Sequence, residues 1–235
     1  MKQLPAIALM TVCIVTLSCK TAARDGSPSS GLAAANNGPA WSHIAPGEFT
    51  MAPPPAANSD AFKKDFEELL SDQQTRTAES CQTGRRQYIP SFKTLFESSP
   101  VLNEQEFKKD EPLFDTVLNL TERIANHFKD QYDRPRPYVT NPAVKPCVPL
   151  ISGNKSYPSS HSAMAAVGAC LIAKQFPDRA AEAEKYGHYL AELRIKIGVH
   201  HPSDVAAGIK LGQDVCAHLL SDDGFLRDFK AIGQR

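Results

Sequence analysis

Apolar residues recur at helical spacing along most of this chain, while the alternating pattern of a half-buried strand is scarce. Residues 62–70 and 104–127 both show the three-and-four spacing of an amphipathic helix. The pattern predicts helices near residues 60–77, 104–132, 160–175, 178–198 and 202–220, with shorter turns around Pro90 and Pro100. Because residues 59–235 have the length of one ordinary domain, we expect an all-α, single-domain helical bundle.

One predicted helix begins beside His161. Residues 158–160 read Pro-Ser-Ser, and the small, apolar run 163–172 follows. The unpaired N–H groups of a first helical turn and the positive end of its dipole attract anions. The Ser159 hydroxyl can add a donor or cap the helix. This segment therefore predicts an anion-binding helix N-terminus.

A second predicted helix begins just after His200. Pro202 suits the first position of a helix, and the pattern from 205 onward continues it. Asp204 then falls in the first turn, where a carboxylate is favoured and can accept an N–H from the His200 ring. Such a hydrogen bond fixes the tautomer and leaves the other ring nitrogen free to act as a nucleophile.

Basic residues accompany both helix starts. Lys129, Arg136 and Arg194 supply cations, and an arginine fork can hold two phosphate oxygens at once. A phosphoryl group in transfer spreads negative charge over its oxygens, so a site that binds no metal must surround it with such groups. Arg134 is interpreted as the surface member of the Arg-Pro-Arg-Pro pair. The pattern predicts a phosphate-handling site.

In order and spacing, three blocks of sequence resemble a known signature. They are residues 129–137 with Lys129, Arg136 and Pro137, residues 157–161, and residues 194–204. Together they resemble the type 2 phosphatidic acid phosphatase and vanadium haloperoxidase superfamily. The bacterial class A non-specific acid phosphatases, which are soluble and all-helical, are the most similar group. The resemblance covers residues 60 to 220 approximately.

The resemblance implies a role for each residue of the signature. His200 would be the nucleophile that forms a phosphohistidine, Asp204 its orienting partner, and His161 the general acid on the leaving oxygen. The implied phosphate-binding residues are Lys129, Arg136, Ser159, Ser160 and Arg194. A histidine with an ordinary pKa of about 6.5 can carry that proton in mildly acidic to neutral solution, so we expect an acidic-to-neutral pH optimum. Because lysine and arginine take the role that a metal ion plays elsewhere, we expect no metal, no cofactor and full activity with a chelator present.

Two positions depart from the family pattern. Ser160 occupies a place where glycine is usual, so a side chain there could crowd the phosphate or require another backbone angle. Leu193 replaces a serine, and loss of that hydroxyl could weaken support for the site. Neither change removes a charged or proton-transferring group. We expect them to affect rate and selectivity more than reaction type.

The other histidines have a structural interpretation by default. His127, His188 and His218 stand alone on predicted helices. His201 neighbours the proposed nucleophile, but only His200 has the spacing to both Arg194 and Asp204. Its role stays open at the level of sequence.

The start of the chain resembles an export signal. The apolar run 7–15 after Lys2 is short for a membrane span but suits a signal peptide over residues 1–19. Residues 17–19 resemble the end of a lipobox, so lipidation at Cys19 and cleavage after Ala23 are both open. We expect a periplasmic or secreted envelope protein, with a membrane tether through Cys19 as one alternative.

Residues 20–58 are rich in Ala, Gly, Ser, Asn and Pro, which predicts a flexible linker or N-terminal arm. The apolar cluster from Trp41 to Phe49 keeps open an ordered strap that wraps the domain. The phosphatase domain would then occupy residues 59–235.

Of the 6 cysteines, Cys13 and Cys19 lie in the export segment. The other four, in an oxidising compartment, predict two disulfides with three possible connectivities. We favour Cys81–Cys147 together with Cys170–Cys216, because the second would join two helices that both begin at the predicted site.

The net charge is +0, which argues against a general nucleic-acid binder. Small, water-soluble phosphomonoesters are the expected substrates of an exported, metal-independent acid phosphatase. Two alternatives stay open: a vanadate-dependent haloperoxidase, and a non-catalytic envelope protein that binds phosphate. The oligomeric state cannot be read from the sequence.

Overall fold

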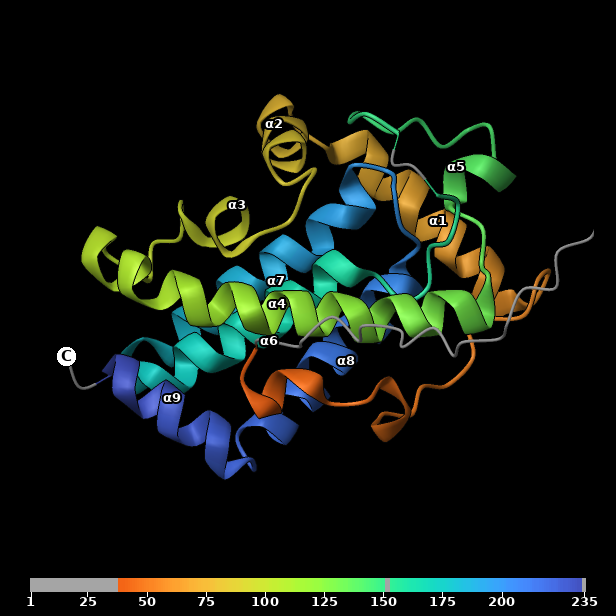
Figure 1. Ribbon diagram of the computed structural model, residues 1–235. Helices are drawn as coiled ribbons and strands as arrows, with labels where there is room; N and C mark the ends of the chain where they lie inside the picture. Colours follow the sequence, from red (N-terminus) through yellow and green to blue (C-terminus); the bar gives the residue numbers. More distant parts are fainter. Residues whose placement is uncertain (1–37, 151–152, 234–235) are drawn as a thin grey trace, which may run out of the picture. The chain divides into compact units, whose positions relative to one another are not determined.

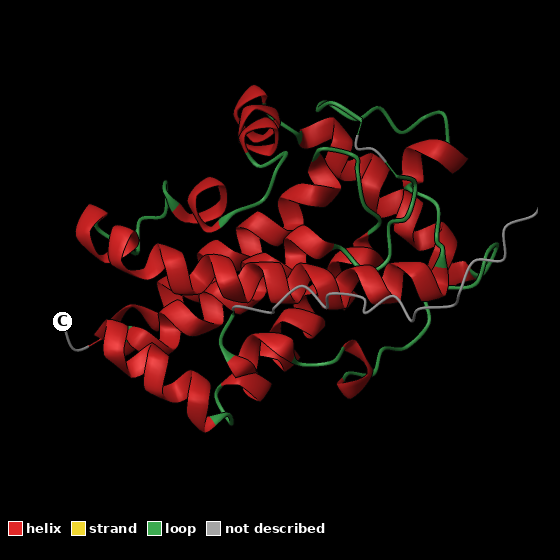
Figure 2. Ribbon diagram, in the orientation of Figure 1, coloured by secondary structure: helices red, strands yellow, loops and turns green. Residues whose placement is uncertain are grey.

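The computed structural model describes residues 38–150 and 153–233, and its described part is all-α (Figures 1 and 2). The α-helices are α1 (Asp60–Thr75), α2 (Ala78–Arg86), α3 (Phe92–Phe96), α4 (Glu104–Tyr132), α5 (Pro137–Thr140), α6 (Ser160–Gln175), α7 (Ala180–Lys196), α8 (Pro202–Leu219) and α9 (Asp223–Gly233). Three 3₁₀ turns are η1 (Ala40–His43), η2 (Pro46–Glu48) and η3 (Pro177–Arg179). No strand occurs in these residues, which confirms the predicted fold class. The export signal and Cys19 lie outside the described residues.

The five long helices match the predicted ranges within a few residues, whereas α2, α3 and α9 were not predicted. In α2 only Ala78 and Cys81 are apolar, so the helix carries no hydrophobic stripe. Local capping starts it instead, since the Thr77 hydroxyl accepts from Ser80 N and the Ser80 hydroxyl accepts from Thr77 N. Helices fixed by caps and tertiary packing leave little periodic signal.

Residues 38–58 lie against the helices as an ordered strap, drawn in orange along α4 in Figure 1. The Trp41 indole donates to Asp228 at 2.8 Å, and its ring meets Phe225 edge-on at 5.0 Å between centroids. Farther along, the Tyr157 hydroxyl donates to the Ala52 carbonyl at 2.8 Å. Of the two sequence alternatives, the described part of this segment therefore has the ordered form, and the compact unit begins at Gly38.

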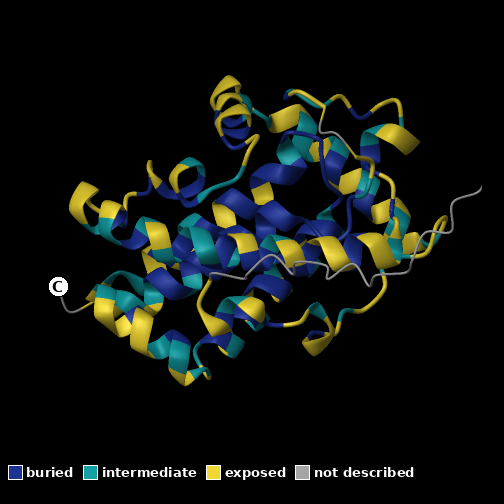
Figure 3. Cartoon of the chain, in the orientation of Figure 1, coloured by how far each residue is buried: buried dark blue, intermediate teal, exposed yellow. Residues whose placement is uncertain are grey.

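Helix α6 packs against α4, α7 and α8, and most of its residues are buried (Figure 3). Two glycines of α8 allow a very close approach. A Cβ on Gly208 would lie 2.4 Å from the Ser159 carbonyl oxygen, and one on Gly212 would lie 2.3 Å from that of Ala163. Because only glycine fits there, the N-termini of α6 and α8 are held side by side.

Both favoured disulfides are present. Cys81–Cys147 joins α2 to the loop after α5, and Cys170–Cys216 joins α6 to α8. The second crosslink reinforces the helix pair whose N-termini meet at the predicted site.

One buried carboxyl group lies far from that site. Asp110 of α4 is fully buried, and its Oδ1 accepts from Gln175 Nε2 at 3.0 Å. Among the described residues, Asp110 Oδ2 and Gln175 Oε1 have no hydrogen-bond partner. Burial raises the pKa of Asp110 to about 6. A protonated Asp110 can donate to Gln175 Oε1 and close a two-bond acid–amide pair.

We expect the free energy of unfolding contributed by Asp110 to fall as pH rises from about 4 to about 6. In this window the folded chain holds a proton that the unfolded chain has lost, since the ordinary pKa is 3.8. Asp110→Asn keeps both amide-type bonds without titrating. In urea unfolding, the free energy of unfolding of Asp110→Asn should therefore exceed that of the parent most at neutral pH and equal it near pH 4.

Asp60→Asn, which removes a fully exposed carboxylate, is the matched control and should show no gain in stability over the parent at neutral pH. A gain for Asp110→Asn that does not vary with pH would contradict the assignment.

Candidate active site

The N-termini of α6 and α8 meet at the predicted histidines. Ser159 N donates to the Asp204 carbonyl at 2.9 Å, and the Ser159 hydroxyl caps α6 by accepting from Ser162 N. Ser159 is thus a buried cap rather than part of a cavity wall. Ser160 has ordinary helical backbone as the first residue of α6, so the absence of glycine imposes no unusual angle.

A short extended segment brings the basic block to these helix ends. Asp133 ends α4 in the left-handed conformation at φ 46°, and Pro135 forms an isolated antiparallel bridge with Lys155. Arg136 N donates to the Asn154 carbonyl at 2.8 Å. In extended backbone, residues two apart face the same side. Arg134 and Arg136 therefore both point inward.

A cavity of about 600 Å³ opens over this cluster. Its lining combines site residues with the end of α4, the segment after α2 and the loop before α6: Tyr88, Pro90, Glu122, Asn126, Lys129, Asp130, Arg136, Gly153, Asn154, Lys155, Ser160, His161 and His200. Arg194 and Asp204 are 1% and 0% exposed. The structure thus gathers all eight predicted site residues in one region, and the loop before α6 borders the cavity.

Two contacts fix the tautomer of His200. Its Nδ1 lies 3.3 Å from Asp204 Oδ2, an acceptor when ionised, so Nδ1 carries the proton. Its Nε2 lies 3.1 Å from Arg136 Nη1, which can only donate, so Nε2 carries a lone pair. Both contacts point to one tautomer, with an unprotonated Nε2 held at the cavity.

The cations are crowded. Burial and the nearby Arg136 lower the pKa of Lys129 to about 7 and that of Arg194 to about 9. Lys129 Nζ donates to the carbonyls of Ser156 and Pro158. In contrast, among the described residues Arg194 Nε and Nη1 have no hydrogen-bond partner. A buried guanidinium that has unpaired donors and lies near another cation, Arg136, is suited to binding an anion.

Burial and nearby cations also affect the two site histidines. Burial and neighbouring cations, Arg194 for His161 and Arg136 for His200, hold the two imidazole pKa values well below 6.5. Both rings are therefore neutral in mildly acidic solution while the site is empty. His161 Nε2 donates to the Gln87 carbonyl at 2.7 Å, which leaves Nδ1 as the other proton-exchanging atom. A bound anion would raise both pKa values.

The structure corrects one prediction and adds two residues. Arg134 is not on the surface: it is 6% exposed and bridges Asp65, at 2.8 Å, and Asp204, at 2.7 Å. Because residues two apart in an extended segment face the same side, the sequence could have indicated that Arg134 points inward together with Arg136. Asp65 and Gln87 carry no sequence signal, because their contacts arise only from the packing of α1 and α2 against the site.

The residue left open, His201, is buried between the rings of Phe62 and Phe66. Burial lowers its pKa to about 3, so it is a neutral packing residue. Leu193 packs in an apolar cluster with Val148 and Ile197.

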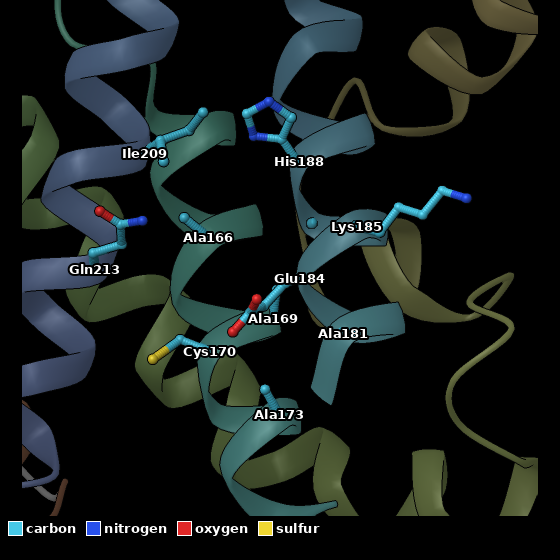
Figure 4. Close-up of a pocket in the computed structure, with 11 residues that line it drawn as sticks. Ala166, Ala169, Cys170, Ala173, Ala181, Glu184, Lys185, His188, Ile209 and Gln213 are labelled. Atoms are coloured by element: carbon cyan, nitrogen blue, oxygen red, sulfur yellow. The ribbon is translucent and has the colours of Figure 1, made fainter. Parts of the chain in front are cut away.

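Away from the active site, His188 is exposed beside Glu192, and His218 lies near Glu48. His188 also borders a second hollow of about 560 Å³, formed by α6, α7 and α8 (Figure 4). Alanines dominate its wall, with Glu184 and Lys185 at the edge. It lacks convergent cations and therefore does not suit phosphate.

The described residues contain no group of three or more His, Cys, Asp or Glu side chains arranged to hold a metal ion. No helix among residues 38–150 and 153–233 is long and apolar enough to cross a membrane. Metal-independence stays a prediction.

Comparison with known proteins gives three results. The model of the PAP2 superfamily matches residues 116–222. Non-specific acid phosphatases of Salmonella typhi and of Salmonella typhimurium (strain LT2) are each 26% identical over 202 residues, covering 79% of this chain and 78% of theirs. The crystal structure of a transmembrane PAP2 type phosphatidylglycerolphosphate phosphatase from Bacillus subtilis aligns with a TM-score of 0.51 and 18% identity. It covers 68% of this chain and 85% of that one.

The matched range contains every predicted site residue from Lys129 to Asp204. The likeness to the Bacillus structure concerns the fold alone. The family match and the two acid phosphatase relatives support a phosphatase, and they confirm the family resemblance that the three sequence blocks indicated.

Proposed function

We propose that this chain, whose residues 116–222 match the PAP2 superfamily model, is an exported acid phosphatase that hydrolyses phosphomonoesters through a phosphohistidine at His200. The observation that carries the proposal is the unprotonated Nε2 of His200, held at the cavity beside idle cationic donors. A lone phosphate-binding function would not require a nucleophile with a fixed tautomer.

The phosphoryl group is held by cations and helix N–H groups. Arg194 offers its idle donors, Lys129 and Arg136 line the cavity, and the first turn of α6 adds backbone N–H groups at Ser160 and His161. Arg136 Nη1 lies 3.1 Å from His200 Nε2. On binding, its fork turns to the phosphate oxygens and frees the lone pair of Nε2.

Transfer then takes place in two balanced steps. The His200 Nε2 lone pair attacks phosphorus and forms an N–P bond, while the P–O bond to the leaving group breaks and its oxygen takes a proton from His161. Water next attacks phosphorus, gives its proton to His161, and breaks the N–P bond to release inorganic phosphate. Asp204 stabilises the positive charge that His200 acquires.

The proposal predicts hydrolysis of p-nitrophenyl phosphate by the purified protein in EDTA, with an acid limb of kcat/KM well below pH 6.5. Protonation of His200 would remove the nucleophile, and its lowered pKa delays that protonation. Vanadate should inhibit. Absence of hydrolysis, or gain of bromide peroxidation with vanadate, would overturn the phosphatase assignment.

His161→Ala is expected to slow alkyl phosphates by about 10²–10⁴-fold and aryl phosphates much less. An alkoxide leaves poorly without a proton, whereas nitrophenolate needs little help. The measurement is kcat for matched alkyl and nitrophenyl esters. Equal losses on both would argue against His161 as the general acid.

Export is also part of the proposal. The signal-like start at 1–19 and the two disulfides, which persist in oxidising compartments, support a location outside the cytoplasm. Cell fractionation would test it, and residence in the reducing cytoplasm would contradict it.

A further inference from the structure

Asp204 is held by more than the histidine it orients. Its Oδ2 lies 3.3 Å from His200 Nδ1 and accepts from His201 N at 2.9 Å, while its Oδ1 accepts from Arg134 Nη1 at 2.7 Å. Both oxygens thus have fixed donors. The contact to His200 is the longest of the three, so the others set the direction of the carboxylate.

Arg134 is itself fixed from a distant part of the chain. Its Nη2 donates to Asp65 Oδ2 at 2.8 Å, and its Nη1 also donates to the Ser203 hydroxyl at 2.7 Å. Asp65 lies on α1, outside the range that the family model matches. A residue from outside that range therefore reaches the His200–Asp204 pair through one buried guanidinium.

Asp65 also holds the helix that carries Asp204. Its Oδ1 accepts from Ser203 N at 3.0 Å, in the first turn of α8, and its Oδ2 accepts from the Ser203 hydroxyl. A carboxylate at this place satisfies an orphan N–H and complements the helix dipole. Asp65 thereby fixes both Arg134 and the start of α8.

We infer that Asp65 and Arg134 are positioning residues, which hold the Asp204 carboxylate ionised and directed at His200 so that Nε2 keeps its lone pair. The inference rests on the proposed function and deepens it. Arg134 supplies the positive charge, and Asp65 prevents that charge from pulling the carboxylate away from His200.

Asp204 needs these donors to stay ionised, because its burial favours the protonated form. Burial raises its pKa, while Arg134, the His201 N–H, Lys129 and Ser156 act in the opposite direction. The other charged or titratable groups around it are Asp65, Arg136, His200 and His201. Removing Arg134 therefore favours protonation of the pair, and removing the charge of Asp65 disfavours it.

The test compares the parent with four variants by kcat/KM for p-nitrophenyl phosphate from about pH 4 to 8. Arg134→Gln should move the acid limb up by about one pH unit or more. Asp65→Asn keeps an acceptor for Ser203 N but loses the charge, so its limb should move to lower pH. Shifts of opposite sign cannot come from a general loss of stability.

Glu106→Gln is the matched control. It breaks the half-buried ion pair with Arg179, at 2.8 Å, on the other end of α4, on the order of 35 Å from Lys129 along the helix. The acid limb of its kcat/KM profile should lie at the same pH as that of the parent. Arg134→Lys retains the charge without the fork, so kcat should fall with little movement of the limb. Unmoved limbs in both Arg134→Gln and Asp65→Asn, or shifts of the same sign, would overturn the inference.

A second measurement does not require turnover. In ¹⁵N-labelled protein the imidazole nitrogens of His200, assigned by their loss in His200→Ala, should report the Nδ1–H tautomer in the parent and its loss in Arg134→Gln at mildly acidic pH. A parent protein without phosphatase activity would contradict the proposed function but not the role of Arg134. The same His200 tautomer in the parent and in Arg134→Gln would contradict the role of Arg134.

Discussion

His200→Ala is expected to lower kcat for p-nitrophenyl phosphate by about 10⁴-fold or more, because it removes the unprotonated Nε2 that forms the covalent intermediate. The neighbouring His201 cannot substitute. It is buried between two phenylalanine rings, and its pKa of about 3 reflects a closed environment.

The fold should survive this change. His200 precedes α8, and its backbone N–H bonds to the Arg194 carbonyl irrespective of the side chain. Far-UV circular dichroism and thermal unfolding should therefore match the parent closely. His188→Ala is the matched control, since that exposed ring lies on α7 outside the cavity and its loss should leave kcat unchanged. Residual activity in His200→Ala within tenfold of the parent would contradict a nucleophilic role.

Arg194→Met is expected to raise the melting temperature of the empty protein while lowering kcat/KM by about 10²–10³-fold. The guanidinium is 1% exposed, and its Nε and Nη1 atoms lack partners among the described residues. Burying such a charge costs stability, and an apolar side chain of similar length removes the cost. In the loaded site the same charge meets phosphate oxygens.

Thermal unfolding with and without inorganic phosphate separates the two effects. Phosphate should stabilise the parent strongly and Arg194→Met weakly, because only binding to the folded state raises its stability. Arg179→Met is the control, and the opposite effects on stability and activity are expected for it. Arg179 pairs with Glu106 at 2.8 Å, so this control should lose stability and keep its activity. A destabilised Arg194→Met with normal activity would show that Arg194 is structural.

The sequence was sufficient to predict features that depend on a single helix or a single turn. The starts of α6 and α8 follow from Ser159 and Pro202, whose capping and fixed φ act within a single turn. The family resemblance then indicated which histidine lies at each start. The long apolar stripes gave the central helices within a few residues.

Contacts between distant segments were not predictable in the same way. The inward direction of Arg134 depends on the bridge between Pro135 and Lys155, and the interpretation as a surface residue was wrong. Asp65 looks like any polar helix residue until α1 packs on α8. Trp41 lies in a segment of linker-like composition, yet it finds Phe225 far along the chain.

The covalent intermediate is the central claim, and trapping it tests the claim most directly. The protein is mixed with substrate, quenched within milliseconds in alkali, which preserves N–P bonds, and digested for mass spectrometry. We predict one added phosphoryl group on the peptide that contains His200. The group should be absent from His200→Ala, and it should accumulate when the attack of water on the intermediate is slow. Turnover with an unmodified His200, or a phosphoryl group on another side chain, would contradict the account.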